Sequence, residues 1–154
     1  NLAEKLDFTE SRLGSDNEEV VLLKKQYSLL QIKDYLLMKQ VSEKCNLKPV
    51  FVLYFYSNVE GECENCDTAG HVLTYLRETY PQLRVYSFDY NLDLGALKTL
   101  ISINKIKPEF PAFVVNEKTY YGLSDQESIT TTLPKSLLLT ATTTSKTQAT
   151  STKK

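Results

Sequence analysis

The sequence predicts an α/β fold: a mixed sheet of about four strands flanked by helices, with a long helical extension at the N-terminus. The first observation is an apolar, aromatic and β-branched run at 50–58, which is typical of a buried strand. The second is the alternation of helical and strand-like segments after it, which requires a parallel crossover. The third is a compact hairpin, with its turn at Asn116-Glu117-Lys118.

The N-terminal segment is predicted to form two helices, a short one over 2–13 and a long one from Val20 to about Lys44. Asp16 or Asn17 is the expected N-cap of the long helix. We expect its C-terminal half to pack on the sheet while the rest projects. The alternative is that its leucines form a dimer seam or lead back to a membrane tether outside the chain shown. These leucines repeat every seven residues in two series, Leu22, Leu29 and Leu36, and Leu23, Leu30 and Leu37.

The later elements follow from periodicity and from breakers such as Pro49, which ends the long helix. A capping box at Ser124-Asp125-Gln126-Glu127 is expected to begin the last helix. The predicted elements are a strand at 50–58, a helix at 67–80, a strand at 83–90, a helix at 94–104, strands at 112–116 and 119–122, and a helix ending near Leu133.

Composition indicates a single core. The chain has 154 residues, of which 42% are hydrophobic, and this suffices for one ordinary domain. Its net charge of −1, with interspersed signs, gives no indication of nucleic acid binding. We divide it into an N-terminal helical extension at 1–46, an α/β domain at 47–133 and a Ser/Thr-rich tail at 134–154 that is expected to be disordered.

The first residue is Asn1 rather than methionine, which we interpret as a processed or trimmed end. No apolar run reaches the ~18–20 residues of a membrane helix. We therefore expect an extracytoplasmic or cell-envelope location with a leader removed, and the cytoplasm remains the alternative.

The pair Cys63-Glu64-Asn65-Cys66 follows the central strand directly and precedes a helical pattern. A helix N-terminus favours a thiolate over a thiol, so this layout predicts a redox-active dithiol that needs no further cofactor. Two alternatives stay open: a purely structural disulfide, and a metal site, for which Cys45 and His71 are the only other soft ligands. We interpret Cys45 as a packing residue and His71 as a surface residue.

From Leu47 to Leu133 the chain resembles the thioredoxin-like family. The resemblance rests on the strand leading into C-x-x-C at a helix start, on the order of the elements, and on Pro111 at the head of the third strand. It implies a three-layer sandwich and thiol–disulfide exchange with protein substrates, driven by an upstream redox partner. Cys63 would be the nucleophile and Cys66 the resolving cysteine.

The resemblance also implies a substrate-binding surface beside the cysteines. Pro111 would be a cis-proline that keeps the site open, and the backbone of Phe110 would hydrogen-bond an extended substrate. Tyr56, Glu64 and Asn65 complete the expected surface.

Several residues depart from the family pattern. Glu62 replaces the usual tryptophan before the first cysteine, and Tyr54 stands where thioredoxins bury an acid. Negative charge around the thiols disfavours the thiolate, so we expect a reducing rather than a strongly oxidising pair. The competing hypothesis is a non-catalytic adaptor whose long N-terminal helix mediates oligomerisation, with a homodimer as one form, or tethering. The acidic residues are Glu60, Glu62, Glu64 and Asp67.

Overall fold

The computed structural model describes residues 1–139, and within them the predicted α/β architecture is confirmed. The elements are α1 (Leu2–Leu13), α2 (Glu18–Cys45), β1 (Val50–Tyr56), α3 (Cys66–Thr79), β2 (Leu83–Asp89), α4 (Gly95–Ile103), β3 (Ala112–Val115), β4 (Lys118–Tyr121) and α5 (Gln126–Thr131).

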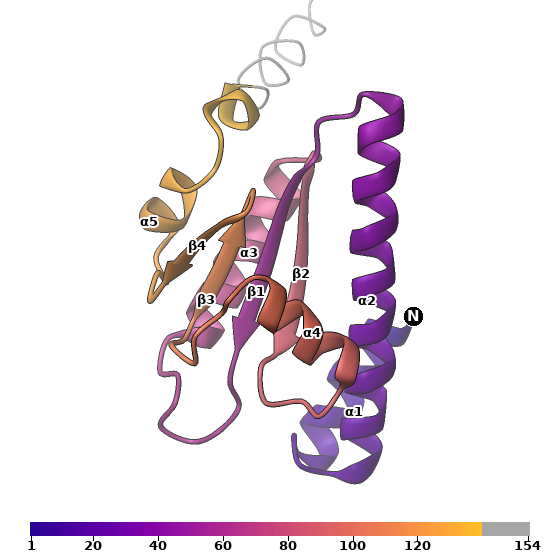
Figure 1. Cartoon of the computed structure of the whole chain (residues 1–154). Coiled ribbons are helices and arrows are strands. Elements are labelled where there is room, and N and C mark those ends of the chain that lie inside the picture. The colour runs from indigo at the N-terminus through magenta and orange to yellow at the C-terminus, as the bar shows by residue number, and fades with distance from the viewer. Residues whose placement is uncertain (140–154) are drawn as a thin grey trace, which may run out of the picture.

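The sheet is mixed and four-stranded, in the order β2-β1-β3-β4 (Figure 1). β1 runs parallel to β2 and antiparallel to β3, and β4 is antiparallel to β3. Phe55 near the end of β1 pairs with Ala112 at the start of β3. The loop that leaves β1 and the proline that precedes β3 therefore lie at the same end of the sheet.

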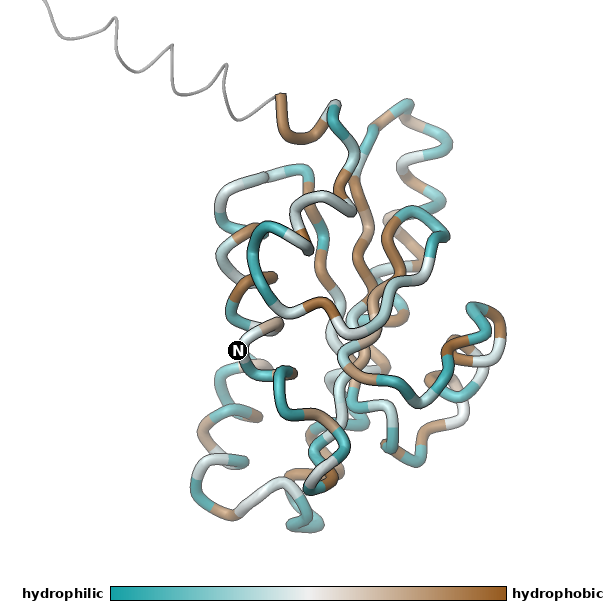
Figure 2. Tube along the Cα trace, turned by 90° about the vertical axis from the view of Figure 1, so that its left-hand side faces the viewer, coloured by the Kyte–Doolittle hydropathy of each residue, from teal (hydrophilic) through white to brown (hydrophobic). Residues whose placement is uncertain are grey.

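Successive side chains of β1 point to opposite faces of the sheet and build two separate cores. Tyr54 packs with α3 and with Phe113 on one face, while Phe55 packs with α4 and with Phe88 on the other. Hydrophobic colour accordingly runs along the strands at the centre of the molecule (Figure 2). Helices cover both faces, which gives three layers.

The two N-terminal helices form a hairpin that packs on itself and on the sheet. Leu6 of α1 contacts Val20 and Leu23 of α2 in a small core of their own. The Asn1 side chain caps α1 in a capping box with Glu4. The Asn17 side chain accepts the Glu19 backbone N–H and caps α2, as expected.

The C-terminal half of α2 packs on the sheet through Ile32 and Tyr35, as expected, but the N-terminal half packs on α1 instead of projecting. α2 runs beside the edge strand β2 (Figure 1). The Gln31 amide donates to the Ser87 carbonyl oxygen at 2.8 Å and accepts the Ser87 N–H at 2.9 Å. This amide satisfies backbone groups of the edge strand that would otherwise be open to another chain. α2 extends well beyond Gln31, to Cys45. Cys45 in its last turn is exposed and free rather than a packing residue.

The C-terminal part differs from the prediction in two details. Asp125, not Ser124, is the N-cap of α5, because the Asp125 carboxylate accepts the Ser128 N–H at 2.8 Å. Leu137 is buried in the core with Ile129, so packing continues beyond the predicted domain end at Leu133. Of the tail that was expected to be disordered, 140–154 lies outside the described residues.

Candidate redox site

Cys63 and Cys66 form a disulfide, with an Sγ–Sγ distance of 2.03 Å and a Cα–Cα distance of 5.6 Å. Cys66 is the first residue of α3 and is buried, whereas Cys63 lies three residues earlier in the loop and is half-buried. Gly61, with φ of 80°, provides the turn before them, a conformation that suits glycine best. Once the disulfide is reduced, Cys63 is thus the more accessible of the two thiols.

Tyr54 lies beneath the start of α3. Its hydroxyl donates a hydrogen bond of 2.6 Å to the Cys66 carbonyl oxygen, and its ring stacks on Phe113 at 5.2 Å between centroids. Burial raises the pKa of the Tyr54 hydroxyl well above its ordinary value, with a smaller contribution from Asp67. Tyr54 therefore acts as a protonated hydrogen-bond donor and is unsuited to accept a proton from Cys66 near neutral pH.

A pocket of about 450 Å³ opens beside Cys66. Glu10 reaches it from α1, so the N-terminal hairpin forms one of its walls. Burial also raises the pKa of the Tyr56 hydroxyl, which keeps this group neutral. The walls include Glu10, Tyr54, Tyr56, Cys66, Asp67 and His71.

Phe110 and Pro111 lie beside the end of β1, as the register of β1 and β3 requires. The peptide bond between them is cis. Pro111 is almost fully buried, and its carbonyl oxygen accepts the Gly122 N–H at 2.8 Å. The Phe110 ring packs on Tyr90, whereas its backbone N–H and C=O make no hydrogen bond to any other residue of 1–139.

The predicted acidic surroundings are present on the surface. Glu60, Glu62, Glu64 and Asp67 are all exposed, and in the described chain none of them forms an ion pair. Asn65, between the cysteines, is exposed as well.

Glu62 has a structural role that the sequence did not suggest. Its carboxylate accepts hydrogen bonds from the Ser57 hydroxyl and from the Asn91 amide, the latter at 3.1 Å. The residue before Cys63 thereby fastens the cysteine loop to the end of β1 and to the segment after β2.

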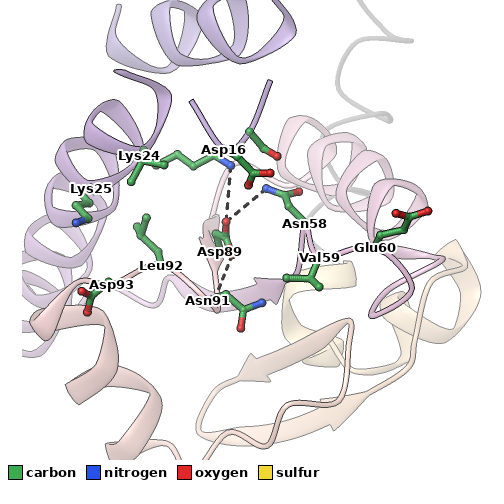
Figure 3. A pocket seen from close by; sticks show the side chains of 12 residues that line it. Asp16, Lys24, Lys25, Asn58, Val59, Glu60, Asp89, Asn91, Leu92 and Asp93 are labelled. Atoms are coloured by element: carbon green, nitrogen blue, oxygen red, sulfur yellow. Dashed lines mark hydrogen bonds and ion pairs between the residues drawn. The ribbon is translucent and has the colours of Figure 1, made fainter. Parts of the chain in front are cut away.

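A buried lysine beneath this loop was also missed (Figure 3). Lys24 Nζ lies 2.7 Å from Glu10 Oε1 and 3.7 Å from Asp89 Oδ2, and its side chain is only 4% exposed. Both contacts are ion pairs, and neither has the geometry of a regular hydrogen bond. Asp89 in turn accepts the Asn91 N–H at 3.1 Å and the Asn58 amide at 3.4 Å.

Lys24 and Asp89 line a second pocket, of about 520 Å³, beside residues 58–60 of the cysteine loop. Asp89 ends β2, a parallel neighbour of β1, and Asn91 follows it. Their place at the carboxyl ends of the strands was a usable signal. Lys24 gave no such signal, because one lysine in an amphipathic helix is ordinarily solvated.

The metal alternative gains no support from the described residues. Within 1–139, no three His, Cys, Asp or Glu side chains gather to hold a metal ion. Cys45 precedes the start of β1, and the disulfide follows its end, so these thiols lie at opposite ends of the sheet.

No protein family matches the sequence, and no curated protein matches it either. The likeness to thioredoxins therefore rests on the mixed four-stranded sheet with its helices and on the disulfide-forming cysteine pair, which fit such a fold. This combination is compatible with a redox function. In the part of the chain described, no helix is both long enough and apolar enough to cross a bilayer.

Proposed function

We propose that this chain is a thiol–disulfide oxidoreductase that reduces disulfides in protein substrates through Cys63 and Cys66. The observation that carries the proposal is the position of the disulfide. It lies at the N-terminus of α3 with Cys63 as the accessible sulfur, at the same end of the sheet as the free backbone of Phe110.

In the reaction, the Cys63 thiolate attacks one sulfur of a substrate disulfide. The substrate S–S bond breaks, the other substrate sulfur leaves as a thiolate and takes up a proton, and a mixed disulfide forms. The Cys66 thiolate then attacks the Cys63 sulfur and expels the second substrate thiolate. Two electrons pass to the substrate, the Cys63–Cys66 disulfide remains, and an external dithiol must reduce it again.

The proposed substrate surface lies around Phe110. A substrate strand in extended conformation has a donor and an acceptor available there, as in strand addition to an open backbone. Pro111 is buried, so its contribution is to shape this backbone rather than to offer a side chain. Tyr56 in the adjoining pocket, and Glu64 and Asn65 between the cysteines, would contact the residues on either side of the target cystine.

The proposed direction, reduction, rests on the charge around the cysteines. Unpaired carboxylates beside the sulfurs disfavour the Cys63 thiolate and so destabilise the reduced pair relative to the disulfide. A strong oxidant needs the opposite, namely a strongly stabilised thiolate. Titration of the Cys63–Cys66 pair against glutathione should therefore give a reduction potential closer to about −270 mV than to about −120 mV.

Reduction of insulin disulfides, with dithiothreitol as the external reductant, tests the function. We expect the chain to accelerate precipitation of the insulin B chain, and the Cys63→Ser variant to lose this activity. Cys45→Ser is the matched control, because Cys45 is exposed and distant from the disulfide, and it should retain full activity. Equal rates for the chain and for Cys63→Ser would show that the disulfide is structural.

A further inference from the structure

One face of α2 carries large apolar side chains that the rest of residues 1–139 leaves exposed. At 100° per residue, the five exposed leucines of α2 fall within an arc of about 120°. The buried residues of α2, from Val20 to Ile32, occupy the other side and face α1 and the sheet. The leucines and their exposed fractions are Leu22 57%, Leu29 36%, Leu30 54%, Leu36 52% and Leu37 57%.

The spacing of this face is that of a helix–helix seam. Exposed residues recur in alternating steps of four and three, the period that keeps a seam facing a second helix. Leu22, Leu29 and Leu36 hold every second position of the series, and Leu30 and Leu37 lie beside them. The full series is Leu22, Gln26, Leu29, Lys33, Leu36 and Gln40. A face of this period matches a second helix running alongside it.

We infer that the partner is a second copy of this chain, with α2 packed antiparallel against α2. The first turn of the exposed face bears Glu18 and Glu19, whereas its C-terminal half bears Lys33 and Lys44. A parallel pair in register would place each of these charges beside its own copy, which is unfavourable. An antiparallel pair places Glu18 of each copy across from Lys44 of the other.

Two further features fit the antiparallel pair. Antiparallel helix dipoles attract, whereas parallel ones repel. With Leu29 across from Lys33, every seam leucine faces a Gln or Lys of the other copy, whose aliphatic stem covers the leucine while its polar end reaches water. Polar residues in a seam restrict register and cost stability, so the dimer should be specific and reversible. In this register Glu43 lies across from Glu19 of the other copy, which is one unfavourable contact, whereas in a parallel pair each of the five charged residues would face its own copy.

This dimer does not depend on the redox chemistry. The leucine face points away from the sheet, and the disulfide lies at the end of β1. Both copies of the disulfide therefore stay open to substrate.

Sedimentation velocity of the full chain at increasing concentration, up to about 100 µM, tests the inference. We expect a reversible dimer, and we expect Leu29→Glu combined with Leu36→Glu to be monomeric with an unchanged circular dichroism spectrum. Leu47→Glu is the control, because Leu47 is equally exposed but follows the helix, and it should leave the dimer intact. A monomer at all concentrations, or a dimer that survives both glutamates, would overturn the inference.

A charge swap tests the direction of the helices. Glu18→Lys alone and Lys44→Glu alone should each raise the dimer dissociation constant by about two- to fivefold. The two changes together should restore it, because the across-dimer pairs are re-formed with reversed sign. Failure of the double variant to recover would overturn the antiparallel arrangement.

Discussion

The Tyr54 hydroxyl donates a 2.6 Å hydrogen bond to the carbonyl oxygen of Cys66, so the central strand is joined directly to the residue that begins α3. By the resemblance to thioredoxins, this hydroxyl takes the place of a buried acid. Because burial raises its pKa, the bond persists across the physiological pH range. The resolving cysteine is thus positioned by a neutral donor.

Tyr54→Phe should lower the free energy of unfolding by about 1 kcal/mol, the usual net value of one hydrogen bond. Urea titration of the oxidised protein measures this change. Tyr56→Phe is the matched control, since the Tyr56 hydroxyl makes no hydrogen bond to other residues of 1–139 and its loss should matter less. Equal effects of the two variants would mean that the bond to Cys66 contributes nothing.

The acidic residues around the disulfide should slow thiolate formation. In the reduced protein we expect the Cys63 thiol to have a pKa nearer the ~8.5 of a free thiol than the values of strong oxidants. Glu60→Gln combined with Glu64→Gln should lower that pKa and speed alkylation by iodoacetamide about twofold at neutral pH. Glu78→Gln, near the far end of α3, should leave the rate unchanged. A Cys63 pKa below about 6 in the unaltered chain would contradict the predicted reducing character.

Lys24 should be a strong determinant of stability. Lys24→Ala leaves Glu10 and Asp89 without their buried cation, and removal of one partner of such a pair costs about 3–5 kcal/mol. Glu10 is partly exposed, so we expect the lower end of that range, visible as a large fall in the thermal midpoint. Lys25→Ala, one residue along the same helix and outside this cluster, should change stability by less than about 0.5 kcal/mol.

Asp34 should make part of the protein's free energy of unfolding depend on pH in the acid range. The Tyr86 hydroxyl donates to the Asp34 carboxylate at 2.7 Å and Arg84 lies 3.1 Å away, and these contacts lower the pKa of Asp34, Tyr86 contributing most. A depressed pKa in the folded state stabilises the protein above the unfolded value of about 3.9, and this stabilisation is lost as the pH falls through the folded value.

The free energy of unfolding of Asp34→Asn should therefore fall below that of the unaltered chain near neutral pH, and the difference should vanish in strong acid. Asp34 is nearly half exposed, so solvent screening keeps the difference small. Tyr86→Phe removes the hydrogen bond that contributes most to the low pKa of Asp34. The free energy of unfolding of this variant should therefore depend less on pH in the acid range. A difference that stays constant with pH would refute the role of this carboxylate.

Local patterns were sufficient for the elements and for the cysteine pair. The apolar run of the central strand, the periodicity of the helices and the C-x-x-C spacing are all properties of neighbouring residues, and the structure reproduces them with shifts of one or two residues at most ends. The cap of α5 shows the limit of local evidence. Ser124 and Asp125 are both good N-cap residues, and the choice depended on which side chain reached the Ser128 N–H.

By itself, then, the sequence determined the order of strands and helices, the dithiol and the acidic residues around it. Only the tertiary structure decided which part of α2 is buried and which partners Lys24 finds. Gln31 and Ser87 are 56 residues apart in sequence, and no local preference brings them together. Such contacts arise when two cores close on opposite faces of one sheet, and the same closure gives Lys24 two carboxylates and leaves the leucine face of α2 open.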